Sequence, residues 1–142
     1  MDLSMTTQHC LTLSCFAAVI SAASVAEASI PAEVDKAFAN YVALPGSIVP
    51  ILERVKDKTT ADAEADNLYK ELTKVYDTRS ELQKITNLPP DVAEQLKQKY
   101  ASDMRTRWGE VYKHIFRLQK VRCYDSVPFF KQFHTLCMML EQ

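Results

Sequence analysis

Apolar side chains recur at intervals of three and four residues along two long stretches of this chain, the spacing that places them on one face of an α-helix. The stretches cover about residues 60–86 and 91–124. The Asn-Leu-Pro-Pro sequence at residues 87–90 ends the first helix, because proline lacks a backbone donor and forces the preceding residue out of the helical region. The pattern predicts two long helices whose short link favours an antiparallel hairpin.

Shorter helical patterns flank this predicted hairpin. One runs from Pro31 to Leu44, where Pro45-Gly46 ends it, and a second short piece extends to about Lys58. The last pattern begins near Val127 and is apolar on most sides. The chain holds only two glycines, too few for the tight turns that an all-β fold requires. We therefore predict an all-α, bundle-like fold with a long hairpin and shorter flanking helices.

The N-terminal 28 residues have a different pattern. A mainly apolar run from Leu11 to Ala26 ends in Ala26-Glu27-Ala28, an arrangement typical of a secretory signal peptide that is cleaved after Ala28. We expect a signal peptide at residues 1–28 and a single helical domain at residues 29–142, located in the periplasm or secreted from a bacterium. The first ten residues contain no lysine or arginine, so an uncleaved leader that anchors the chain to a membrane is the alternative.

Charge argues against one class of partner and leaves another open. The chain has 17 basic and 18 acidic residues, so it has no overall attraction for nucleic acid, and we expect no nucleic-acid partner. Residues 97–122 are locally basic, with eight lysines and arginines against two acids and with aromatic residues between them. We expect this face to be solvated and paired with acids of the other long helix. A basic and aromatic strip that binds a polyanion, an anionic lipid or a glycan is the alternative.

The predicted last helix suggests contact with a partner. Its paired methionines lie near phenylalanines on a helix that is apolar on most sides, which indicates an exposed surface for a partner or for self-association. Together with the basic and aromatic strip, this pattern provides seven candidate interaction residues: Arg105, Trp108, Tyr112, Phe129, Phe133, Met138 and Met139.

Two cysteines follow the predicted cleavage point, Cys123 and Cys137, and an even number suggests a disulfide in an oxidising compartment. If the long helix reaches residue 124, helical geometry leaves Cys137 about 10 Å beyond the position opposite Cys123. A bridge then requires the helix to unwind near Lys120 or the last helix to cross it steeply. Buried thiols and an intermolecular disulfide are the alternatives. A metal site formed by Cys123, His134 and Cys137 is a further alternative.

No residue pattern in the chain indicates catalysis. There is no spacing of serine, histidine and acid that suggests a nucleophilic site, and no Cys-x-x-Cys-His sequence for haem attachment. We therefore expect no cofactor and no enzymatic activity. Arg79 occupies an apolar position of the first long helix, where we expect it to pair with Asp103 or Glu110.

Residues 51–72, ILERVKDKTTADAEADNLYKEL, resemble a segment of small uncharacterised bacterial secreted proteins built on helical hairpins. This resemblance implies export and a helical fold, and it implies no activity. The sequence as a whole predicts an exported small helical protein that acts as a protein-interaction or envelope-associated structural module. We expect its partner to be another protein or an envelope component. A protein that binds a metal or small ligand through Cys123, His134 and Cys137 is the second hypothesis.

Overall fold

The structure is a computed structural model that describes residues 29–141, and the predicted signal peptide at residues 1–28 lies outside this described part. Helices and short connections make up residues 29–141, which contain no β-strand. The helices are α1 (Ala32–Ala43), α2 (Pro45–Arg54), α3 (Lys58–Lys84), α4 (Pro90–Lys120) and α5 (Val127–Glu141). The prediction of an all-α, bundle-like fold is therefore confirmed.

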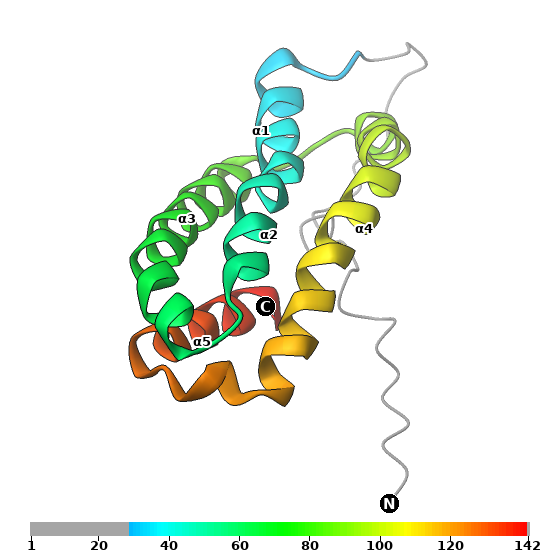
Figure 1. The fold of residues 1–142 in the computed structure, drawn as a ribbon. Helices are drawn as coiled ribbons and strands as arrows, with labels where there is room; N and C mark the ends of the chain where they lie inside the picture. The colour runs from blue at the N-terminus through cyan, green and yellow to red at the C-terminus, as the bar shows by residue number, and fades with distance from the viewer. Residues whose placement is uncertain (1–28, 142) are drawn as a thin grey trace, which may run out of the picture.

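The two long helices, α3 and α4, run in opposite directions, as predicted, and are joined by residues 85–89 (Figure 1). They make few direct contacts with each other, however. The helices α1 and α2 follow one another between α3 and α4 and contact both, while α5 crosses the lower end of the bundle and packs against α3. The predicted direct pairing of the long helices is thus wrong, because α1 and α2 are apolar enough to fill the space between them.

Burial follows the helical spacing of the sequence. The buried side chains of α3 are Ala61, Ala65, Leu68, Leu72, Val75 and Leu82, and those of α4 are Val92, Leu96, Trp108, Val111, Ile115 and Leu118. These side chains belong to two core clusters. The smaller cluster joins α1 to the link between the long helices, and the larger one includes residues of α2, α3, α4 and α5. Each long helix therefore buries one continuous face, as its sequence pattern predicts.

Proline shapes the connection between α1 and α2. Leu44 keeps a helical conformation, with φ −53° and ψ −42°, and Pro45 begins α2 directly after it. The Ile48 N–H donates to the Leu44 carbonyl (3.3 Å), so hydrogen bonding continues across the proline. The break that was predicted at Pro45-Gly46 is therefore only a short interruption within one line of helix.

A capping box fixes the start of α3. The Thr60 N–H donates to the Asp57 carboxylate (2.8 Å), and the Asp57 N–H donates to the Thr60 hydroxyl (3.0 Å). This reciprocal pair begins α3 at Lys58, two residues before the predicted start at residue 60. It also sets the position of Asp62, which contacts the start of α5.

The connection between α4 and α5 contains a left-handed turn, formed by Arg122–Asp125. All four residues have a positive φ, between 49° and 57°, and none is glycine. The Tyr124 N–H donates to the Val121 carbonyl (2.8 Å), and the Ser126 N–H donates to the Cys123 carbonyl (3.1 Å). A left-handed conformation costs L-amino acids other than glycine about 1–2 kcal/mol per residue. The long helix α4 therefore ends at Lys120. The prediction that it extends to residue 124 is wrong.

Glycine at an exposed position of the left-handed turn is expected to stabilise the protein. Because glycine adopts positive φ without a steric penalty, Arg122→Gly should raise the free energy of unfolding by up to about 1 kcal/mol. Arg122→Ala keeps the Cβ atom and should give no such gain. Both substitutions remove the same exposed ion pair with Asp125, so its loss cancels in the comparison. Urea denaturation measures the two stabilities, and equal values would show that the turn is not strained.

Candidate functional site

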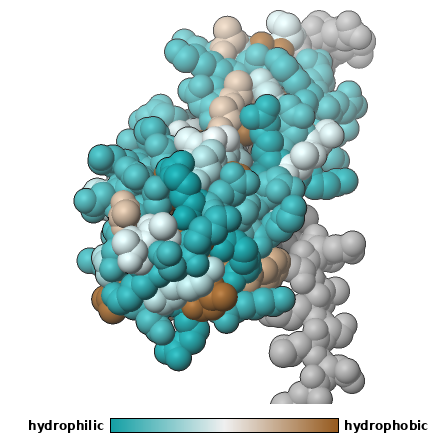
Figure 2. All heavy atoms as spheres, viewed as in Figure 1, coloured by the Kyte–Doolittle hydropathy of each residue, from teal (hydrophilic) through white to brown (hydrophobic). Residues whose placement is uncertain are grey.

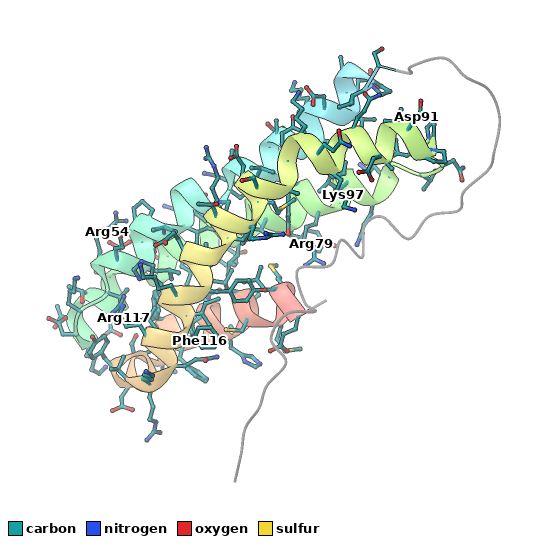
Figure 3. All side chains as sticks on the ribbon, turned by 90° about the vertical axis from the view of Figure 1, so that its right-hand side faces the viewer. Arg54, Arg79, Asp91, Lys97, Phe116 and Arg117 are labelled. Atoms are coloured by element: carbon teal, nitrogen blue, oxygen red, sulfur yellow. The ribbon has the colours of Figure 1, made fainter. Side chains whose placement is uncertain are left out.

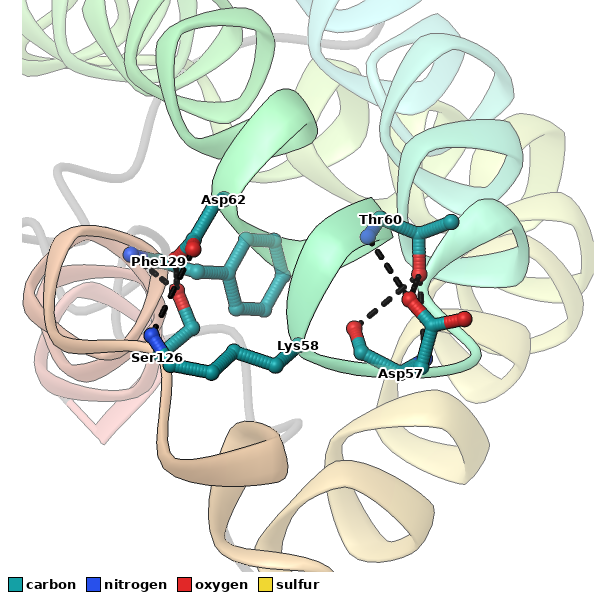
Figure 4. A network of polar contacts seen from close by, with 6 residues as sticks. All are labelled: Asp57, Lys58, Thr60, Asp62, Ser126 and Phe129. Carbon is teal, nitrogen blue, oxygen red and sulfur yellow. Dashed lines mark hydrogen bonds and ion pairs between the residues drawn. The ribbon is translucent and has the colours of Figure 1, made fainter.

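The start of α5 is held by a fully buried serine (Figure 4). The Ser126 hydroxyl donates to the Asp62 carboxylate of α3 (2.5 Å) and accepts from the Phe129 N–H (3.3 Å), so it caps α5 and ties it to α3. The hydrogen bond from Ser126 is the main reason that the pKa of Asp62 lies below its usual value. Lys58 lies 3.4 Å from the same carboxylate. These contacts orient α5 across the lower end of α3.

The second half of α4 is held against α2 by Arg117. Its guanidinium donates to the backbone carbonyls of Leu52 (2.6 Å) and Val55 (3.0 Å), at the end of α2 where a cation is favoured. His114, about one turn earlier, lies 3.7 Å from the Glu53 carboxylate. Burial, together with the nearby Arg117, lowers the pKa of His114. Arg117 and its contacts thus fix the part of α4 that lies next to α5.

Most of the exposed large apolar side chains in the described part lie on the last turns of α4, on the connection after it and on α5. The exposed fractions are 52% for Phe116, 38% for Val121, 78% for Val127, 52% for Phe130 and 46% for Met138. Figure 2 shows hydrophobic patches at the lower end of the molecule, where these segments lie, with hydrophilic side chains between them.

Exposed cations lie among these apolar side chains. Lys113 and Lys120 belong to α4, Arg122 to the left-handed turn and Lys131 to α5. Lys113 is 3.4 Å from Glu110 and Arg122 is 3.9 Å from Asp125, but these pairs are exposed and therefore weak. Between residues 113 and 138 the chain has a single acidic residue, so this region carries positive charge. We call the five apolar and four basic residues together the end surface.

Three of the seven predicted interaction residues belong to the core. Trp108, Phe129 and Phe133 are at most 3% exposed, so they are not available to a partner and the prediction is wrong for them. The apolar side of α5 packs against α3, and Trp108 lies against Tyr41 of α1 with 5.2 Å between the ring centroids. Their size and apolar character therefore serve packing.

The other four predicted interaction residues are at least partly accessible. The hydroxyl of Tyr112, a half-buried residue, donates to the Leu140 carbonyl (3.4 Å) and so joins α4 to α5. Met139 is also half-buried, whereas Arg105 and Met138 are exposed. Of these four, only Met138 is part of the end surface.

Sequence reasoning missed Phe130, a main contributor to the end surface. Its ring stacks on that of His134 on the outer side of α5, with 6.2 Å between the centroids. Helical spacing distinguishes it from its neighbour, because Phe129, Phe133 and Leu136 follow one another at intervals of four and three residues. This series marks the buried face of α5 and leaves Phe130 outside it, at its edge, where the ring is 52% exposed.

The basic residues of α4 do not pair with acids of α3 in the predicted manner. Lys99 pairs with Asp35 of α1 (2.7 Å), and the Tyr100 hydroxyl donates to the same carboxylate (2.7 Å). Hydrogen bonds from Lys99 and Tyr100 lower the pKa of Asp35. The first half of α4 is therefore tied to α1, since α1 lies between the two long helices.

Both cysteines of the described part are free thiols. The sequence indicated that unwinding of α4 near Lys120 would allow the two cysteines to form a disulfide, and α4 does end at Lys120. Cys123 belongs to the larger core cluster, and Cys137 packs against it. Burial raises the pKa of the fully buried Cys123 to about 11, with a smaller contribution from the negative charge of Cys137. The thiol is thus the stable form of Cys123 at neutral pH, and the disulfide stays a prediction.

Cys123 is expected to resist alkylation in the folded, reduced protein. Burial raises the pKa of both thiols, but Cys123 is fully buried with a pKa of about 11, so iodoacetamide at mildly alkaline pH should modify the half-buried Cys137 faster. Mass spectrometry of peptides after timed alkylation measures both rates. Urea should remove the difference between them. Equal rates in the folded protein would contradict the position of Cys123 in the core.

The predicted metal site is not formed in residues 29–141. No group of three or more histidine, cysteine, aspartate or glutamate side chains in this part is placed to hold a metal ion. Cys123 lies in the core, whereas His134 is exposed and stacks on Phe130. The alternative ligand set of Cys123, His134 and Cys137 is therefore not brought together.

Arg79 does not form the predicted ion pair with Asp103 or Glu110. Its guanidinium donates to the backbone carbonyl of Met139, where a cation is favoured by the end of α5, and Figure 3 shows Arg79 next to that helix. A shallow pocket beside it is lined by Tyr76, Arg79, Ser80, Gln83 and Met139. The pocket has no carboxylate or histidine, so its lining offers no ordinary acid–base pair for catalysis.

Comparison with family models, curated proteins and solved structures finds no match for this chain. The resemblance of residues 51–72 to bacterial secreted helical-hairpin proteins therefore stays a prediction. The fold and the site define the class only as a small all-α bundle with a basic and apolar surface at one end.

Proposed function

We propose that the protein is an exported helical binding module that docks onto a component of the bacterial envelope and has no catalytic activity of its own. The observation that carries this proposal is the end surface, where exposed apolar and basic side chains lie together. Contiguous or clustered apolar side chains on a surface mark interaction sites, because water contact is unfavourable for them. Binding is therefore the function that this surface supports best.

Rigidity of the segments that carry the end surface also supports binding. Arg117 fixes α4 to α2, Ser126 fixes the start of α5 to α3, and Arg79 contacts the end of α5. A surface that is already ordered loses less conformational entropy when it meets a partner. The end surface is thus prepared for docking without a rearrangement of the fold.

Cell fractionation tests the proposal. We expect the full chain, expressed with residues 1–28 in a bacterium, to yield a protein that begins at Ser29 and is recovered with the envelope. The double substitution Phe116→Ser/Phe130→Ser should release it into the soluble fraction. The control Tyr69→Ser/Tyr76→Ser removes two rings of α3 that are 59% and 65% exposed, and it should have no effect.

Two results would contradict the proposal. An intact chain that stays in the cytosol would exclude export. Equal recovery of the original protein and the Phe116→Ser/Phe130→Ser variant with the envelope would exclude the end surface as the docking site. Circular dichroism of each variant checks that the helices are retained.

A further inference from the structure

Apart from Val121, which follows the end of α4, the apolar residues of the end surface lie on the outer sides of helices. Val127 and Phe130 are on the same side of α5, and Met138 extends this side at helical spacing. Phe116 lies on α4 near α5 (Figure 3). These side chains project outward from the end of the bundle, so a partner that binds them contacts residues of both α4 and α5.

The charge of the end surface restricts the chemistry of that partner. Its four exposed cations lie near three acids: Asp125 in the turn, Glu110, which is 3.4 Å from Lys113, and Asp62, which accepts from the Ser126 hydroxyl. The chain as a whole has 17 basic and 18 acidic residues, so the small excess of cations is a local property of this end. A negatively charged partner is therefore favoured.

The way in which apolar and basic residues alternate distinguishes a lipid surface from an acidic protein. Protein interfaces have an apolar centre that is depleted of charge and surrounded by a polar rim. In the end surface three of the five apolar residues have a cation close by in the chain: Lys120 follows Phe116 by one helical turn, Arg122 follows Val121 and Lys131 follows Phe130. This mixture suits a bilayer interface, where rings enter the acyl boundary and cations stay with the phosphates.

We propose that the end surface docks onto an anionic phospholipid membrane, with Phe116 and Phe130 inserted at the interface and Lys120 and Lys131 at the lipid phosphates. This inference rests on the proposed function and names its partner. No helix within residues 29–141 is long and apolar enough to cross a bilayer, so the bundle would lie on the membrane surface.

Sedimentation with lipid vesicles tests the proposal on protein purified after expression of the full chain. The probes are vesicles of phosphatidylcholine alone and vesicles that also contain phosphatidylglycerol. We expect binding to the anionic vesicles to be at least about tenfold stronger, since each basic side chain near an anionic surface strengthens binding roughly fivefold. High salt should weaken this binding, because it screens the attraction between exposed charges.

Two double variants identify the side chains that bind. Lys120→Glu/Lys131→Glu should weaken binding by about 30-fold or more. Phe116→Ser/Phe130→Ser should weaken it by about tenfold, since two half-exposed rings no longer leave water. All variants have the same N-terminal residues, so any contribution of the leader is common to them.

Matched controls separate the end surface from general properties of the protein. Lys36→Glu/Lys70→Glu makes the same change of charge at exposed positions of α1 and α3, and Tyr69→Ser/Tyr76→Ser removes exposed rings from α3. Both should retain most of the binding. Equal losses in the controls and in the end-surface variants would overturn the proposal, because net charge or general hydrophobicity would then explain the binding.

The remaining outcomes distinguish this inference from the proposed function. Envelope recovery in cells without binding to anionic vesicles would overturn the lipid inference and assign the surface to a protein partner. Vesicle binding by a chain that stays in the cytosol would instead overturn export and leave the lipid inference standing. A dimer that Phe116→Ser/Phe130→Ser converts to a monomer, without vesicle binding, would overturn the lipid inference in favour of a second copy.

Discussion

Replacement of Trp108 by alanine is expected to lower the free energy of unfolding by about 3–5 kcal/mol. Trp108 is 1% exposed and belongs to the larger core cluster, to which α2, α3 and α5 also contribute. Its ring lies 5.2 Å from that of Tyr41, so it also fills the contact between α4 and α1. Alanine would leave a cavity at this position, and urea denaturation measures the resulting loss of stability.

A matched substitution, Trp108→Phe, separates ring volume from hydrogen bonding. The indole N–H is buried and has no hydrogen-bond partner in the described part of the chain, so its removal should cost nothing. Phenylalanine retains most of the apolar ring, and we expect a loss of only about 1–2 kcal/mol. Similar losses for phenylalanine and alanine would contradict a role based on filling the core.

Replacement of Arg117 by methionine is expected to lower the free energy of unfolding by about 2–3 kcal/mol, because two charge-assisted hydrogen bonds are lost. Methionine preserves an unbranched apolar side chain but removes the guanidinium donor from the carbonyls of Leu52 and Val55, of which Leu52 still accepts from the Val55 N–H (3.3 Å). Thermal or urea denaturation measures the stability. Hydrogen exchange should also show faster opening at the end of α2, where these carbonyls lie.

The matched control for this substitution is Arg105→Met, at an exposed position of the same helix. We expect it to change stability by less than about 0.5 kcal/mol, as is usual for surface positions. If the two variants lost the same stability, removal of any positive charge from α4 would explain the effect. The contacts of Arg117 with α2 would then have no special importance.

Helix positions could be predicted from the sequence, but the neighbours of each helix could not. Residues 60–86 and 91–124 correspond to α3 and α4, because hydrophobic spacing and the prolines at residues 89 and 90 act locally. An apolar stripe shows which side of a helix is buried, yet it does not show what covers that side. The insertion of α1 and α2 between the long helices therefore has no signal in either long pattern.

The left-handed turn also has no local signal. The turn contains neither glycine nor asparagine, and of its residues only Asp125 belongs to a type that is enriched at positive φ. The burial of Cys123 and of Ser126 holds the turn, and these are contacts with distant segments. Tertiary packing overrides local preference here, which explains why the end of α4 was predicted too far along the chain.

For the candidate site, the sequence showed that large apolar residues lie on the last helix, but it did not show which of them are accessible to solvent. Phe129 and Phe133 were expected at a surface because they are large and close to Met138, whereas Phe130 was missed. A difference of one residue in the start of a helix rotates every side chain by about 100°. Since Ser126 sets the start of α5 through Asp62, the accessible side of α5 depends on a long-range hydrogen bond.

The left-handed turn has a consequence for the order in which the molecule assembles. An unfolded chain rarely populates four successive left-handed residues, so this segment becomes stable only after its surroundings have formed. We therefore expect α5 to attach late in folding, so that Leu136→Ala accelerates unfolding and leaves the folding rate nearly unchanged in stopped-flow experiments. A large decrease in the folding rate would contradict this order. If α5 attaches last, partly folded molecules lack the end surface, and the proposed docking onto a membrane is confined to molecules that have completed the bundle.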